Sequence, residues 1–256
     1  MDQEEIQHLD DELIMNDVAR AVEERELVAY YQPVYDLRGG SLVEVEALVR
    51  WTLPDGTLIP AALFVPSLDR MGVTAGLDWF MAEEGSAMQP KVGVPVALNF
   101  AALHADDPAF IQTLNDTASW HESQGAQLHI ELQERFLTDE SLGMGDFVAS
   151  LREAGICVTA DNVTSGVEGL PVLAELGVQQ VKLARSAWED MDAEQLAAYV
   201  ACADELGLLL GATGVESAED AEFLSDAGCA RAQGFYLGEP MDADALLSTD
   251  ALKENH

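Results

Sequence analysis

Eight apolar, strand-like segments alternate with helical patterns along most of the chain, and this alternation constrains the fold more than any other feature. The segments cover residues 27–37, 42–51, 94–100, 128–134, 156–163, 178–184, 208–215 and 230–238. Only the first two are joined by a short turn, residues 38–41, whose Arg-Gly-Gly-Ser sequence is typical of a hairpin. Alternating strands and helices predict a parallel sheet covered by helices. Eight such strands favour a closed α/β barrel of the TIM type over an open doubly wound sheet.

The helical patterns support this fold class. Residues 107–125, 192–207 and 217–228 each begin with a capping residue and end with glycine, as helices do. The glycine-rich GxGxxG pattern follows none of the strand-like segments, which removes the main signature of a dinucleotide-binding fold.

The length of 256 residues fits one large barrel domain. We expect an amphipathic helix over residues 1–25, the barrel over residues 26–250 and a short tail over residues 251–256. In the first of these, apolar residues recur at helical spacing, namely Ile6, Leu9, Leu13, Val18 and Val22.

Charge and cysteine content exclude several classes of partner. The chain has 47 acidic and 12 basic residues, a formal net charge of −35, which disfavours binding to nucleic acid backbones and to anionic membranes. No apolar run reaches the roughly 18 residues of a membrane span, and the acidic start is unlike a signal peptide. Cys157, Cys202 and Cys229 are scattered, which fits the reducing cytoplasm rather than a disulfide framework. The acidity is either an adaptation, for example to high salt or for solubility, or an acidic surface that docks a protein partner.

The segment 42–51 alternates between an apolar and a polar face. Val43, Val45, Ala47, Val49 and Trp51 share one face, while Glu44, Glu46, Leu48 and Arg50 share the other. An edge strand with one solvated face is one interpretation. A strand whose polar face lines a functional site is the other.

Polar side chains gather near the C-terminal ends of the predicted strands, where barrels of this type carry their chemistry. They are Glu46, Asn99, Glu131, Glu134, Asp161, Asn162, Lys182 and Gln233. Oxygen ligands from separate strands suit a hard divalent ion such as Mg²⁺ or Mn²⁺ rather than zinc. A lysine beside such a cluster neutralises a phosphate or orients a water, so the set suggests metal-assisted phosphoryl chemistry.

These residues lie in a series of motifs that resembles a known family. The motifs are YYQPVYDL (30–37), Glu46-Ala47-Leu48 within VEALVRW, PDG (54–56), LNF (98–100), IELQE, VKLARS, GVES and AQGFYLGEP. In this order and spacing, over about residues 27–246, the chain resembles the EAL domains, bacterial phosphodiesterases that open cyclic di-GMP to the linear dinucleotide pGpG. The resemblance implies a TIM-like barrel with one antiparallel strand, usually dimeric, with two Mg²⁺ or Mn²⁺ ions at its mouth.

The resemblance also implies a role for each matching residue. Glu46, Asn99, Glu131 and Asp161 match metal ligands. Gln32, Leu48 and Arg50 match substrate contacts, with Arg50 reaching a phosphate. Lys182 matches the lysine near the attacking water, Gln233 matches a glutamine near the metal and the water, and Glu134 matches a glutamate that steadies the loop after the fifth strand.

Three positions depart from the family pattern, and each departure removes an acid. Asn162 replaces the second of two paired aspartates, Ala184 replaces the aspartate of a Lys-Ile-Asp motif, and Thr213 replaces a glutamate assigned to metal binding or proton abstraction. Loss of a positioned general base typically costs about 10²–10⁴ in rate.

We therefore expect a catalytically impaired receiver or regulator that binds cyclic di-GMP, with Mg²⁺ or Mn²⁺ bound weakly or not at all, and that forms a homodimer. A weak metal-dependent phosphodiesterase is one alternative. A nucleotide-independent protein-interaction module is the other, with the acidic surface or residues 3–25 as its contact.

Overall fold

The computed structural model describes residues 20–21, 24, 26–71, 74–100, 108–123, 125–249 and 252. The expected N-terminal helix and C-terminal tail lie mostly outside these residues. Of the expected helix over residues 1–25, Arg20 and Ala21 are described and are helical.

The described strands are β1 (Leu27–Asp36), β2 (Leu42–Thr52), β3 (Leu58–Pro60), β4 (Val96–Asn99), β5 (His129–Gln133), β6 (Cys157–Val163), β7 (Gln180–Leu183), β8 (Leu209–Ala212) and β9 (Arg231–Ala232). The helices are α3 (Ala61–Met71), α4 (Ala75–Val92), α5 (Pro108–Ser123), α6 (Glu134–Leu137), α7 (Met144–Glu153), α8 (Leu170–Leu176), α9 (Arg185–Trp188), α10 (Ala193–Glu205), α11 (Ala218–Ala227) and α12 (Ala243–Leu247). There are also two short 3₁₀ helices, η2 (Glu140–Leu142) and η3 (Val167–Gly169).

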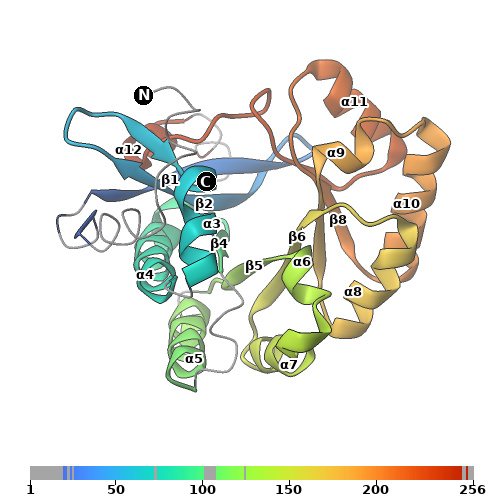
Figure 1. The fold of residues 1–256 in the computed structure, drawn as a ribbon. Helices are drawn as coiled ribbons and strands as arrows, with labels where there is room; N and C mark the ends of the chain where they lie inside the picture. The colour runs from blue at the N-terminus through green and yellow to red at the C-terminus, as the bar shows by residue number, and fades with distance from the viewer. Residues whose placement is uncertain are drawn as a thin grey trace.

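Eight strands close into a barrel, as the alternation predicts. Around the ring the order is β1, β9, β8, β7, β6, β5, β4 and β2, and β1 pairs with β2 to close it. β1 is antiparallel to both of its neighbours, whereas the other pairs in the ring are parallel. Figure 1 shows helices α5, α7, α8, α10 and α11 outside the strands. The fold is the predicted TIM-like barrel with one reversed strand.

Both faces of β2 are buried. Val45, Ala47, Val49 and Trp51 belong to the core outside the barrel, where Trp51 packs edge-on against Phe64 of α3 with ring centroids 5.9 Å apart. On the opposite face, Glu44 is 1% and Glu46 is 8% exposed. This burial excludes the solvated edge strand, so the polar face of β2 lines the barrel interior.

Local sequence signals define the helix ends. Asp192 and Ser217 cap α10 and α11, and each forms a reciprocal capping box with the residue three positions on. Gly228 ends α11 with φ of 96°, a left-handed conformation that glycine adopts without a steric penalty.

The structure differs from the sequence prediction at two places. The three-residue strand β3 pairs antiparallel with the end of β2 and was not predicted, because its pattern is too short to show a period. The last two predicted strands, 208–215 and 230–238, are shorter in the structure because their C-terminal residues leave the sheet and form the barrel mouth. Among the described helices, none is both long and apolar enough to cross a membrane.

Candidate functional site

Neighbouring strands bring the predicted metal ligands to one end of the barrel. Glu46 on β2 pairs with Ala97 of β4, and Asn99 at the end of β4 pairs with Glu131 of β5. Asp161 on β6 pairs with Gln133, the last residue of β5. The parallel register therefore gathers the four oxygen donors along adjacent strands at the barrel mouth.

Lys182 on β7 is the cation inside this group. Its ammonium contacts the Oε1 atom of Glu131 and lies 3.3 Å from the Oε2 atom of Glu46. It also donates to the Oε1 atom of Gln233 at 3.3 Å. Lys182 is only 6% exposed, so this is a buried ionic cluster, which we call the Lys182 cluster.

Amide side chains complete the hydrogen bonds around Glu46. Gln233 donates from Nε2 to Glu46 Oε2 at 2.6 Å and to Gln32 Oε1 at 3.0 Å. Asn99 donates from Nδ2 to Glu46 Oε1 at 2.7 Å. Both oxygens of Glu46 are thus satisfied by protein groups, and Gln32 of the reversed strand β1 joins the Lys182 cluster.

Excess acid shifts the protonation equilibria of the cluster. Burial and the nearby charge of Glu46 hold the pKa of Glu131 well above its ordinary value. The same two causes raise the pKa of Asp161 to about 6. Burial acts to lower the pKa of Lys182, but the surrounding carboxylates, led by Glu131, outweigh it and raise that pKa. The site therefore holds more acidic groups than its one lysine neutralises.

The chemical type of these donor atoms fits a hard divalent cation. Glu46, Asn99, Glu131 and Asp161 supply oxygen ligands, which Mg²⁺ and Mn²⁺ prefer. The Oε2 atom of Glu131 is buried and has no hydrogen-bond partner, which leaves an acceptor for a cation. However, among the residues that the structure describes, no three His, Cys, Asp or Glu side chains are grouped closely enough to hold a metal. With Lys182 between Glu131 and Glu46, a metal and the lysine compete for the same carboxylates.

A second buried polar layer lies beneath this cluster and was missed by sequence reasoning. Glu44 on β2 contacts His129 Nδ1 through its Oε2 atom at 2.6 Å, and Arg231 of β9 lies 3.5 Å from the same atom. Its Oε1 atom is 4.0 Å from the ammonium of Lys182. The sequence does contain a signal for this layer. Residues two apart in a strand lie on the same face, so Glu44 shares a face with Glu46 and His129 shares one with Glu131.

Glu134 holds the loop that follows β6, the fifth of the predicted strands. Its Oε2 atom accepts from the backbone N–H groups of Thr164 at 2.9 Å and Ser165 at 3.3 Å, and its Oε1 atom contacts the Ser165 hydroxyl. Tyr199 of α10 donates to the carbonyl of Ser165 at 3.1 Å from the other side. Glu134 therefore orders a loop and takes no part in the Lys182 cluster.

The three positions at which the resemblance implies a missing acid do not form one group. Asn162 and Thr213 both line a hollow of about 440 Å³ at the mouth, together with Gln32, Glu46, Asp161 and Gln233. Asn162 adopts a left-handed backbone with φ of 52°, which Asn tolerates better than most residues. Ala184 is 5% exposed, precedes α9 and stands outside the described lining of that hollow.

A second hollow of about 300 Å³ adjoins the first. The two share Glu46, Leu48, Gln133 and Asp161 in their walls, and the second extends beneath α3 and α4. Arg50 stands outside the described lining of both hollows. Its guanidinium donates to the carbonyl of Val49 at 2.8 Å and lies 5.9 Å from the ring centroid of Tyr30. The Arg50 guanidinium therefore bonds to the backbone of its own strand, β2, and does not line either hollow.

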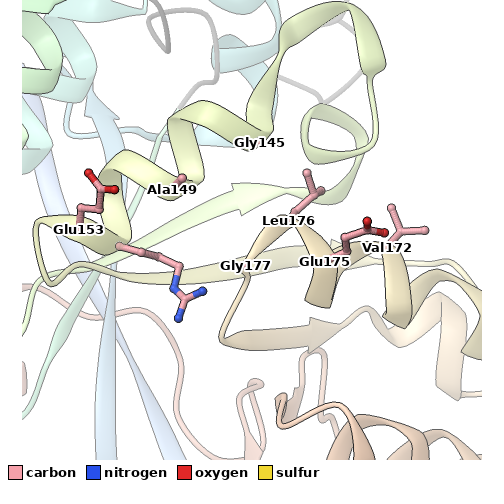
Figure 2. Close-up of a pocket in the computed structure, with 8 residues that line it drawn as sticks. Gly145, Ala149, Glu153, Val172, Glu175, Leu176 and Gly177 are labelled. Atoms are coloured by element: carbon pink, nitrogen blue, oxygen red, sulfur yellow. The ribbon is translucent and has the colours of Figure 1, made fainter.

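A larger surface groove lies elsewhere on the molecule. It has a volume of about 680 Å³ and is lined by Gly145, Ala149 and Glu153 of α7 and by Val172, Glu175 and Leu176 of α8. Figure 2 shows these residues. None of the predicted site residues lines it. The carboxylate, amide and lysine cluster at the barrel mouth is thus the candidate site, although it is not the largest hollow.

Two curated proteins have sequences similar to this chain over most of its length. The chain is 28% identical over 249 residues to the bifunctional diguanylate cyclase/cyclic di-GMP phosphodiesterase MucR of Pseudomonas aeruginosa, a match that covers 93% of this chain and 36% of that protein. It is 28% identical over 241 residues to the cyclic di-GMP phosphodiesterase RocR of the same organism, covering 90% of this chain and 62% of that protein. The chain thus spans only part of the length of these curated relatives.

Solved structures have the same fold as this chain. The MucR phosphodiesterase, in complex with cyclic di-GMP, superposes with a TM-score of 0.80 at 25% identity, covering 91% of this chain and 99% of that one. The EAL domain of FimX from Pseudomonas aeruginosa has the same fold, with a TM-score of 0.77 at 21% identity over 89% of this chain and 96% of that one. The EAL domain family model matches residues 15–240, nearly the whole barrel, so the chain belongs to the EAL domain family.

Proposed function

We propose that this EAL domain binds cyclic di-GMP at the mouth of its barrel and is impaired in hydrolysing it, which makes it a receiver or regulator. The observation that carries the proposal is the lining of the 440 Å³ hollow. Gln32, Glu46, Asp161 and Gln233 are retained there, while Asn162 and Thr213 are neutral at positions where the family carries acids. The MucR complex with cyclic di-GMP supports the choice of ligand.

The residues that remain would hold a cation. Glu46, Asn99, Glu131 and Asp161 would be its ligands, with Lys182 competing for two of these carboxylates, and a bound Mg²⁺ or Mn²⁺ would activate water and stabilise charge on the phosphate. The chain's own contribution to proton transfer is what is missing. Thr213 cannot act as a base at neutral pH, and Asn162 offers at most a neutral oxygen. Loss of a general base alone typically lowers the rate by about 10²–10⁴.

Slow metal-dependent hydrolysis is the second candidate. It is favoured by one observation, that the four oxygen donors, Lys182 and Gln233 still lie together at the mouth. The two candidates differ in the product that is formed. A slow enzyme converts cyclic di-GMP to pGpG with Mn²⁺, whereas a receiver does not.

Calorimetric titration of cyclic di-GMP, with and without Mg²⁺, tests the binding. We expect a dissociation constant in the micromolar range or below. Arg50→Ala should weaken it by about 10- to 150-fold, since a hydrogen bond to a charged group contributes roughly 1.5–3 kcal/mol. Among the described residues no carboxylate forms a salt bridge with Arg50, so its charge is available for a dianionic ligand. Arg38→Ala, on the exposed turn between β1 and β2, is the matched control.

Unchanged affinity in Arg50→Ala would refute the contact between Arg50 and the phosphates of the ligand. Absence of binding by the wild-type protein would refute the receiver and leave the protein-interaction module.

The proposal includes a homodimer. The loop after β6, which Glu134 and Tyr199 hold in place, exposes Val167 (36%) at the surface where the family resemblance implies the dimer contact. Light scattering at tens of micromolar protein should give twice the monomer mass, and a monomer mass would contradict it.

A further inference from the structure

Two large aromatic side chains are exposed beside the candidate site. Phe235 is 66% and Tyr236 is 53% exposed. Along the chain they follow Gln233 and Gly234, and Gln233 belongs to the Lys182 cluster. Of the two aromatic residues, Phe235 lines the 440 Å³ hollow, whereas Tyr236 stands outside its described lining.

The turn that carries Phe235 is held tightly. A Cβ atom on Gly234 would lie 2.2 Å from the backbone of Val215, so only glycine fits this approach. Tyr236 donates from its backbone N–H to the carbonyl of Val215 at 3.1 Å, and Gly238 donates to the carbonyl of Gly234 at 2.9 Å. Gln32 holds the far end of the turn by donating to the carbonyl of Gly238 at 2.9 Å. The backbone therefore determines where the Phe235 ring leaves the chain.

The rest of the hollow gives a dianionic ligand little attraction. Its lining includes the acids Glu46, Asp161 and Glu216 and contains no lysine or arginine among the described residues, since Arg50 stands outside it. These walls therefore add no basic contact to the one proposed for Arg50, and the flat faces of the bases would supply a further part of the binding. An exposed aromatic ring suits this role because every base offers a π-face.

We propose that Phe235 is a stacking surface for one guanine base of the ligand. The inference rests on the proposed function, because it assigns a contact within the same site. The rim position of the ring explains its exposure, which the bound base would cover.

Titration of cyclic di-GMP into matched variants tests the contact. Phe235→Leu keeps an apolar side chain but removes the ring, and should weaken binding by about 5- to 150-fold, the range expected when a stacked base loses its aromatic partner. Phe235→Tyr should retain an affinity close to that of the wild type. Tyr236→Leu is the control, since that ring stands outside the lining, and should bind like the wild type.

A spectroscopic readout separates stacking from a general change in affinity. In Phe235→Trp, saturating cyclic di-GMP should quench the added indole emission, measured as the difference from wild type. In Tyr236→Trp it should not. Equal affinity of wild type and Phe235→Leu, with no quenching in Phe235→Trp, would overturn the stacking contact alone. Failure of the wild type to bind would overturn the proposed function and the contact together.

Discussion

The ammonium of Lys182 and the carboxylate of Glu131 form a buried ion pair at the mouth of the barrel. The same ammonium lies 3.3 Å from Glu46, whose strand β2 stands opposite β7 in the ring. The lysine thus contacts two of the acids that a metal ion would need. This relationship links the stability of the barrel to the chemistry of its site.

Removing Lys182 should destabilise the fold. Lys182→Met keeps a similar volume but leaves Glu131 and Glu46 without their cation, and breaking a buried pair in this way costs about 3–5 kcal/mol. Urea unfolding in the presence of a chelator measures the loss. Adding Glu131→Gln to Lys182→Met should recover part of it, because the unpaired charge is then removed. Equal stability of Lys182→Met and wild type would show that the pair is not formed.

Glu134 should control the order of the loop after β6. Glu134→Ala removes the acceptor for the Thr164 and Ser165 backbone N–H groups, so both amides should exchange hydrogen faster. Hydrogen exchange followed by mass spectrometry checks this, with the exposed Glu140→Ala on η2 as control. Unchanged exchange across residues 163–169 would mean that Tyr199 alone holds the loop.

The buried histidine of α5 should give stability a pH dependence. Burial lowers the pKa of His121, which is fully buried and lies 3.1 Å from the Ser86 hydroxyl. A proton then binds the unfolded chain more readily than the folded one. The contribution of His121 is therefore fully present above its unfolded pKa of about 6.5, and it is lost as the pH falls from there through the folded pKa.

The free energy of unfolding of wild type and His121→Gln, compared at about pH 8 and about pH 5, isolates this effect from the many carboxylates. The wild type should lose more stability than His121→Gln over that interval. An equal change in both proteins would contradict the assignment.

Sequence patterns predicted the barrel because strand and helix periods are local. The hairpin of the first two strands and the helix caps at Asp192 and Ser217 appear where they were expected. The boundaries of β8 and β9 were less predictable, because tertiary contacts such as the approach of Gly234 to Val215 end those strands.

The site was predictable as a set of residues but not as a set of contacts. Glu46, Asn99, Glu131 and Asp161 do lie on adjacent strands, as strand order alone implies. The pairing of Lys182 with Glu131, the second layer around Glu44 and the orientation of Arg50 along β2 depend on side-chain geometry across the barrel. A linear pattern carries no such information.

Restoring the missing acids should restore hydrolysis. Asn162→Asp and Thr213→Glu together return two carboxylates to the hollow, and we expect turnover to rise by about 10²–10⁴ over wild type. Each single change should do much less, because groups that act as a unit fail when either is absent. Ala184→Asp, as a third step, should add less, since Ala184 stands outside the described lining. Formation of pGpG with Mn²⁺, followed by chromatography, is the assay.

Double and triple variants that are inactive but still bind cyclic di-GMP would place the defect elsewhere, for example in residues 163–169, which follow Asn162 directly.

The fate of cyclic di-GMP on the wild-type protein with Mn²⁺ tests the impaired site most directly, with calorimetry for binding and chromatography for pGpG. We predict binding in the micromolar range or tighter, with turnover far below an ordinary enzymatic rate of about 1 s⁻¹. Turnover at that rate or above would contradict the impaired site and identify an active phosphodiesterase.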